Sequence, residues 1–260
     1  MCVTRLDRRR LPRYEADQID VPFVIAGHSK LLHHDTSWDE HSHPTHELLW
    51  NEAGTSRAVV GSRIYTVTPT IGLWIPAGVP HSGWSPAGTV QRAAHFSVRT
   101  VPSIADGPVA VDVSPLLRLL LDRVDDDALD ARSRASTETM VIDVLEPAAR
   151  ELMLRMPESA LVQPIVTAVQ ADPADATTLE QWAARLDVST RTITRLFIAE
   201  TGLSFTRWVA TARIQHAMSF LSDGDDLDEV ALRVGYGSSS AFGTAFRRVT
   251  GMSPGRFRAQ

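Results

Sequence analysis

The stretch DDLDEVALRVGYGSSSAFGTAFRRVTG, residues 225–251, decides the fold of the C-terminal part of this chain. Apolar residues recur at helical spacing from Leu227 to Val234 and again from Phe242 to Val249. Gly235 stands between these two runs, where glycine permits the tight turn that ends one helix and lets the next begin. The stretch therefore predicts two short helices joined by a tight turn.

A similar pattern lies upstream, in TTLEQWAARLDVSTRTITRLFIAETG at residues 177–202. Ser189 follows a short turn there, and serine is a residue type that caps helix N-termini well. Ala183 and Ala231 stand at matching places in the two patterns, where small side chains let two helices cross closely. Residues 205–221 form an amphipathic segment that joins the patterns and can pack on both. We therefore predict two helix-turn-helix units in this part of the chain.

Roughly the last 85 to 100 residues resemble the AraC/XylS family of transcriptional regulators. The residues of the last unit that carry the resemblance are, in order, Gly235, Tyr236, Ser238, Ser240, Ala241, Phe242, Phe246, Gly251, Ser253, Pro254, Phe257 and Arg258. The resemblance implies a cytoplasmic, sequence-specific regulator of transcription whose partner is double-stranded DNA. It leaves open whether the protein is an activator or a repressor, and whether it contacts RNA polymerase, a small-molecule effector or a second copy of itself.

The outer face of the second helix of each unit is expected to meet DNA, because that helix lies in the major groove. In the first unit this face holds Arg191, Thr194 and Arg195; arginine can bind guanine or phosphate, and threonine can touch a thymine methyl group. In the second unit the outward residues are Ser239, Ser240, Thr244 and Arg247. The family usually has a large polar residue where Thr244 stands, so we expect this unit to contact the DNA backbone more than the bases. For the arginines, the alternative is an ordinary solvated helix face.

Residues 20–112 consist of short β-branched and aromatic runs broken by Gly and Pro, which is typical of an antiparallel barrel or sandwich. AraC-like regulators commonly carry a small cupin-type barrel, and this segment resembles one. The expected fold class is α+β, with an N-terminal antiparallel β-barrel (cupin) followed by helices, and an all-α C-terminal domain with two helix-turn-helix units. The large aromatic residues of the barrel are expected to lie in its core; they are Trp50, Tyr65, Trp74 and Trp84.

The segment DEHSHPTHELLW, residues 39–50, is the candidate metal site. Side chains two or four residues apart share one face of an extended chain, so His41, His43 and Glu47 point one way. His46 points the other way. The first cupin motif, His-x-His-x3-Glu-x6-Gly, is met from residue 41 to 54, and the second, Pro-x-Gly-x2-His, is met from residue 76 to His81.

Three imidazoles and one carboxylate suit a divalent Fe, Mn, Zn, Ni or Cu ion with open positions for water or a ligand. The resemblance thus implies a metal site formed by His41, His43, Glu47 and His81. The alternative is a metal-free barrel in which these groups bind a small molecule directly. His95 lies on a later strand. Its side chain either lines the barrel or is satisfied within the barrel wall, and we expect the wall.

Two helices are predicted between barrel and C-terminal part. Their expected apolar faces are Leu116, Leu119, Leu120 and Val124 in the first, and Val141, Val144, Leu145 and Leu152 in the second. The predicted division is a sensor domain at 1–112, a helical linker with a dimerisation role left open at 113–160, and the DNA-binding domain at 161–260. A hinge is expected between about 158 and 176, where prolines gather.

The net charge, the cysteine content and the lengths of the apolar runs limit the functions that the chain can have. The net charge is −5, and residues 177–260 hold ten arginines against eight acidic residues, so DNA binding must come from where the arginines lie. Cys2 is the single cysteine, which excludes intramolecular disulfides, and no apolar run approaches the roughly 20 residues of a membrane span.

Two functions remain to be compared. The first is a DNA-binding regulator whose barrel senses a metal ion or small molecule, and it is not an enzyme. The second is a metal-dependent cupin enzyme, an oxygenase or isomerase, with a regulatory helical tail. The same four ligands support both. The tandem helix-turn-helix pattern favours the regulator, because a cupin enzyme has no need of it.

Overall fold

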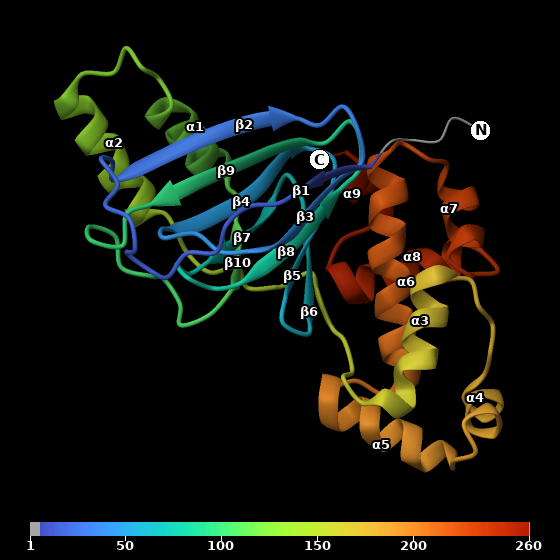
Figure 1. The fold of residues 1–260 in the computed structure, drawn as a ribbon. Helices are drawn as coiled ribbons and strands as arrows, with labels where there is room; N and C mark the ends of the chain where they lie inside the picture. Colours follow the sequence, from blue (N-terminus) through green and yellow to red (C-terminus); the bar gives the residue numbers. More distant parts are fainter. Residues whose placement is uncertain (1–5, 260) are drawn as a thin grey trace. The chain divides into compact units, whose positions relative to one another are not determined.

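The computed structural model of the chain describes residues 6–259 (Figure 1). Its internal contacts divide the chain into two units: unit 1 comprises residues up to 61 and 65–151, and unit 2 comprises 62–64 and 152 onward. The expected boundaries after residues 112 and 160 differ from this division, because the first helix after the strands contacts a strand of unit 1 and the second helix contacts the first. Cys2 lies outside the described residues. Within residues 6–259, no helix is long and apolar enough to cross a membrane.

Unit 1 is built from two sheets. The first has the order β1 (Asp7–Arg9), β3 (Thr36–His41), β8 (His81–Ser85), β5 (Ser56–Val60) and β6 (Arg63–Val67). The second has the order β10 (Val109–Asp112), β7 (Ile71–Ile75), β4 (His46–Ala53), β9 (Val90–Phe96) and β2 (Ile25–Leu31). Strands β4, β7, β9, β2 and β10 pair antiparallel, as do β3, β8 and β5, while β1 joins β3 in parallel. The predicted antiparallel texture is confirmed for these strands.

Alternation along β4 places different side chains on its two faces. Leu48 and Trp50 are almost fully buried in the core, together with Trp74 of β7 and Tyr65 of β6. The core prediction for these aromatic residues is confirmed. Trp84 is only half-buried, and its ring centroid lies 6.0 Å from the guanidinium of Arg57.

Helices α1 (Pro115–Val124) and α2 (Ala131–Asp143) follow the strands. The face predicted for α1 is wrong in part, since Leu116 and Leu119 are 49% and 67% exposed while Leu117 and Leu121 are buried with Leu120 and Val124. The second predicted helix is too long at its C-terminal end. It stops at Asp143, before Pro147, whose missing N–H cannot continue a helix.

Unit 2 is mainly helical, and its elements are β11 (Met153–Arg155), η1 (Ala160–Val162), α3 (Gln163–Ala171), α4 (Leu179–Arg185), α5 (Thr190–Thr201), α6 (Phe205–Ser222), α7 (Leu227–Arg233), α8 (Ser239–Thr250) and α9 (Pro254–Arg258). Helix α3 occupies the segment expected to be a hinge. Its Ile165 and Val169 are buried in a core that also contains Trp182 of α4, Phe197 of α5 and Trp208 of α6. Apolar burial therefore holds α3 within the helical unit.

Both predicted helix-turn-helix units are present, as α4–α5 and α7–α8. Ser189 caps α5 by accepting a hydrogen bond from the N–H of Thr192, as predicted. Gly235 makes the turn after α7 with φ +81°, where a side chain would be strained. A Cβ atom there would also lie 2.9 Å from Cζ of Arg213 and 3.0 Å from Cα of Ala174. Ala183 and Ala231 are both buried.

Candidate functional site

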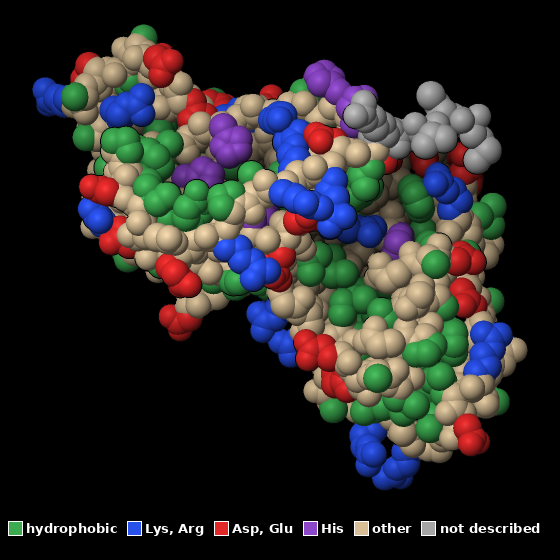
Figure 2. Space-filling model, in the orientation of Figure 1, with side chains coloured by type: hydrophobic (Ala, Val, Ile, Leu, Met, Phe, Trp, Pro, Cys, Tyr) green, Lys and Arg blue, Asp and Glu red, His purple; other side chains and the backbone are tan. Residues whose placement is uncertain are grey.

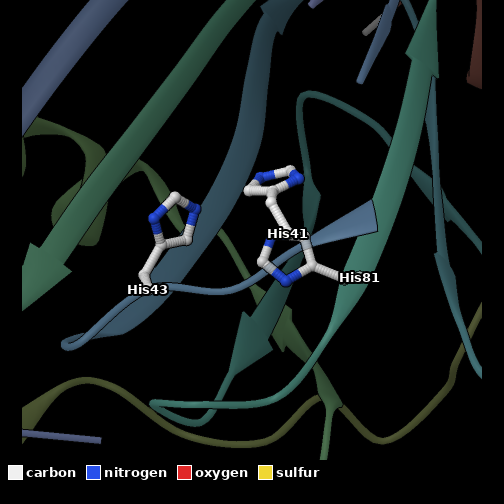
Figure 3. Close-up of side chains that lie close together, drawn as sticks. All are labelled: His41, His43 and His81. Atoms are coloured by element: carbon white, nitrogen blue, oxygen red, sulfur yellow. The ribbon is translucent and has the colours of Figure 1, made fainter. Parts of the chain in front are cut away.

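His41, His43 and His81 converge inside unit 1, and one ring nitrogen from each lies within 4.8 Å of the others (Figure 3). The register of β3 and β8 pairs His41 directly with His81, and a bulge between Trp38 and His41 interrupts that ladder. His43 follows in the loop that leads into β4. Two neighbouring strands and one loop therefore bring together residues that are 40 positions apart in the sequence.

Backbone carbonyls fix the orientation of two of these rings. Nδ1 of His41 lies 2.8 Å from the carbonyl oxygen of Asp39, and Nδ1 of His81 lies 3.0 Å from that of Val79. A carbonyl can only accept a hydrogen bond, so each Nδ1 carries the proton. In the neutral ring, Nε2 then presents a lone pair, which is the form of histidine that binds metals.

Glu47 of β4 is buried beside the three histidines. Its Oε2 lies 3.3 Å from Nε2 of His81 and 3.6 Å from Nε2 of His43. That oxygen forms no hydrogen bond with the described residues. Nε2 of a neutral His81 and the carboxylate oxygen are both acceptors. They repel one another unless a proton or a metal ion lies between them.

The electrostatics of the cluster favour an ionised Glu47 beside neutral His41 and His43. Burial lowers the pKa of His43 to about 4, although Glu47 opposes the shift. Burial alone would raise the pKa of Glu47, but His81, His43 and His95 together lower it well below its usual range. For His81, the neighbouring Glu47 outweighs burial and raises the pKa. The cluster therefore attracts positive charge to the space between Glu47 and the rings.

His46 and His95, which the sequence analysis places outside the metal site, differ in their positions. His46 points away from the cluster as expected: its Nδ1 accepts the N–H of Ala77 at 3.0 Å, and its ring packs on Trp74. His95 does not lie within the wall as expected. Its Nδ1 is 3.0 Å from Oγ1 of Thr45, but the ring lines the central cavity, 4.9 Å from the His43 ring centroid.

The register of β4 and β9 explains the position of His95, because it pairs His95 with Glu47 and so gives both side chains the same face. His28 of β2 stacks on His95 with centroids 5.6 Å apart. Sequence reasoning missed this pair, since the strand pairing that creates it is non-local.

These residues surround a cavity of about 120 Å³ between the two sheets. Its lining includes His28, Trp38, Leu49, Gln91 and His95, besides the four predicted ligands. An engineered protein cavity of about 150 Å³ holds one benzene molecule, so this space suits a ligand of similar or smaller size.

The face of α5 predicted to meet DNA is exposed. Arg191 and Arg195 are exposed and Thr194 is partly exposed. Within the described part of the chain, neither arginine forms a hydrogen bond or an ion pair, and Figure 2 shows basic side chains projecting from the surface over α5. A free guanidinium on a helix face is available for phosphate or a base edge.

The corresponding face of α8 offers fewer free groups. Ser240, Thr244 and Arg247 are exposed, and the hydroxyl of Thr244 donates to the carbonyl of Ser240 at 3.1 Å. Ser239 is half-buried, and its hydroxyl donates to Asp228 of α7. The Ser239 hydroxyl is thus engaged within the unit.

Two sheets around a cavity lined by histidines, followed by two helix-turn-helix units, are the architecture of a DNA-binding protein with a ligand-binding domain. Residues 25–154 match the family model described as the AraC-like ligand binding domain, and residues 182–260 match the helix-turn-helix domain model. The chain belongs to the AraC family and is a DNA-binding transcription regulator with an N-terminal ligand-binding domain.

Two similar proteins are HTH-type transcriptional regulators. The HTH-type transcriptional regulator NimR of Escherichia coli (strain K12) is 28% identical over 85% of this chain and 82% of its own length. The HTH-type transcriptional regulator RipA of Corynebacterium glutamicum is 31% identical over 81% of this chain, which spans 61% of RipA. Among solved structures, the DNA-binding domain of AdpA in complex with a target DNA is 34% identical over 39% of this chain and 92% of that chain, with a TM-score of 0.37.

Proposed function

We propose that unit 1 binds one divalent transition-metal ion through His41, His43, His81 and Glu47, and that its occupancy regulates DNA binding by unit 2. One observation carries the proposal. A buried carboxylate oxygen without a hydrogen bond faces two imidazole nitrogens, and the backbone fixes the His81 ring so that its acceptor nitrogen lies on that side. A metal ion satisfies all of these acceptors at once.

The donor set fits a first-row transition ion. Imidazole nitrogens with one carboxylate suit divalent Fe, Mn, Zn, Ni or Cu better than Mg or Ca, which prefer oxygen ligands alone. Such an ion would act as a Lewis acid and bind a further ligand at its open positions. The chain's own residues would orient the ligands, since the carbonyls of Asp39 and Val79 hold two of the rings.

The cavity beside the proposed ion suits a small anionic effector. Three neutral imidazoles and one carboxylate leave a net charge of about +1 around a divalent ion, which favours an anionic oxygen donor as the next ligand. When Nδ1 of His95 accepts a hydrogen bond from the Thr45 hydroxyl, the Nε2–H of the same ring can donate one to this anionic oxygen. The volume of the cavity limits the effector to a small molecule.

DNA recognition is proposed to depend mainly on α5. Its exposed face offers Arg191, Thr194 and Arg195, whereas the equivalent face of α8 offers mostly small hydroxyl side chains and Arg247. Recognition helices of this kind enter the major groove and place three or four side chains on base edges. The target would be double-stranded DNA in the cytoplasm, and RNA polymerase is a further proposed partner.

Regulation requires the ion or effector to bind two states of the protein with different affinities. The cupin-enzyme alternative uses the same ligands for turnover. We favour the regulator because the described part of the chain contains two helix-turn-helix units, which a cupin enzyme does not need.

We also propose that two copies of the chain associate, since Leu116 and Leu119 of α1 and Met140 of α2 are exposed apolar side chains on unit 1.

The metal proposal is tested by elemental analysis of the full chain purified without an affinity tag. We expect close to one equivalent of a first-row ion in the wild type and loss of that ion in His43→Ala. His33→Ala is the matched control, because His33 is exposed and lies outside the cluster, and it should keep the ion. A wild-type protein that carries no ion and cannot be loaded with one would contradict the proposal.

A further inference from the structure

Helix α5 carries an exposed apolar side chain on the same face as its arginines. Ile198 is 52% exposed, and it follows Arg191, Thr194 and Arg195 by seven, four and three residues, which are the spacings of one helix face. These four residues line one shallow, open groove together with Thr190 and Ala199. A branched apolar side chain therefore lies at the C-terminal end of a surface that is otherwise suited to DNA.

We propose that Ile198, beside the methyl group of Thr194, reads a thymine in the operator by contact with its 5-methyl group. This inference rests on the proposed function, in which α5 enters the major groove. The thymine methyl is the one apolar group that base pairs present there, so an apolar side chain on this face selects thymine. The free guanidinium groups of Arg191 and Arg195 supply the charge complementarity that brings the face against the duplex.

Helix geometry sets the distance between these contacts. A rise of about 1.5 Å per residue places Ile198 about 6 Å from Thr194 and about 10 Å from Arg191 along the axis. Stacked base pairs are about 3.4 Å apart. The thymine is therefore expected at most about three base pairs from the group that Arg191 contacts, the limit reached if the helix axis runs along the duplex.

The second unit lacks this feature. Ser189 and Ser238 are the N-caps of α5 and α8, and the residue nine positions after each cap is Ile198 in α5 but Arg247 in α8. The thymine contact is thus assigned to the half of the operator bound by α5. Loss of thymine methyl groups should therefore weaken binding more in that half than in the half bound by α8.

The test begins with in vitro selection of an operator by the full-length protein. Each thymine is then replaced by deoxyuridine, which removes only the 5-methyl group, and affinities are measured for the wild type and for Ile198→Ala. At one thymine we expect the replacement to weaken wild-type binding about fourfold, the factor for one buried methyl group. The same replacement should weaken binding by Ile198→Ala less than twofold.

Leu232→Ala is the matched control, because Leu232 is a 65% exposed apolar residue on α7, outside the recognition helices. It should keep the wild-type sensitivity to deoxyuridine. This inference would be overturned if the protein binds its operator specifically but each deoxyuridine replacement changes the affinity of the wild type and of Ile198→Ala by the same factor. The proposed function would still stand. Failure to select any operator would overturn both. Unchanged thermal unfolding of Ile198→Ala, expected for an exposed side chain, confirms that the comparison is made between folded proteins.

Discussion

Metal binding should raise the melting temperature of unit 1 by an amount that linkage predicts. A ligand that binds only the folded state adds about 2.7 kcal/mol to its stability when present at about 100 times its Kd. Unit 1 comprises residues 1–61 and 65–151. For a domain of that size about 1 kcal/mol shifts the melting temperature by about 2–4 °C, so the expected increase is roughly 5–10 °C.

Glu47→Gln is the perturbation that tests this reasoning. It preserves the side-chain volume and removes the buried negative charge that faces His43 and His81. Changes to groups that merely support metal ligands cost about 10–100-fold in affinity, so loss of a ligand should cost at least about tenfold, or about 1.4 kcal/mol. At the same metal concentration, the increase in melting temperature should be smaller by about 3–5 °C.

Differential scanning calorimetry of the full chain provides the measurement, and each variant is compared with its own metal-free form. That comparison removes any change that the substitution makes to the metal-free protein. His33→Gln, on the exposed surface of the same unit, should retain the full increase. An equal increase in Glu47→Gln and the wild type would refute the assignment of Glu47 as a ligand.

Four further predictions concern the helices. Arg195→Ala should weaken operator binding by about 1–3 kcal/mol, the value of a lost base contact, and unchanged affinity in a titration would show that the assigned face is wrong. Gly235→Ala should destabilise unit 2 by more than about 1 kcal/mol in chemical denaturation, because the new Cβ meets Ala174 and Arg213 at positive φ. Gly243→Ala, where a Cβ has open space within a helix, should stabilise the same unit by up to about 1 kcal/mol. Leu119→Glu should shift the full chain toward monomer in sedimentation if α1 joins two copies, and an unchanged distribution would remove α1 from that interface.

The sequence predicted best those features that depend on neighbouring residues. Both helix-turn-helix units, the Ser189 cap and the Gly235 turn follow from local periodicity and from residues with few alternative uses. Three of the proposed ligands, His41, His43 and His81, were identified from motif spacing, and the structure brings them together.

The features that the sequence did not predict depend on packing between distant segments. Helix α1 has leucines on more than one face, so its apolar pattern could not decide whether Leu116 or Leu117 is buried; contact with the sheet decides it. The position of His95 depends on the pairing of β4 with β9. Helix α3 lies between prolines that indicated a hinge, yet the core residues of unit 2 bury its apolar face.

The most direct test of the account measures the affinity of the full chain for its selected operator with the metal loaded and with the metal removed. Coupling between two sites in one protein is typically about 1–3 kcal/mol, so the two affinities should differ by at least about fivefold, and the operator should change metal affinity by the same factor. The His43→Ala variant should show one affinity under both conditions. Equal operator affinities of the loaded and stripped wild type would contradict the claim that the barrel's metal site regulates DNA binding.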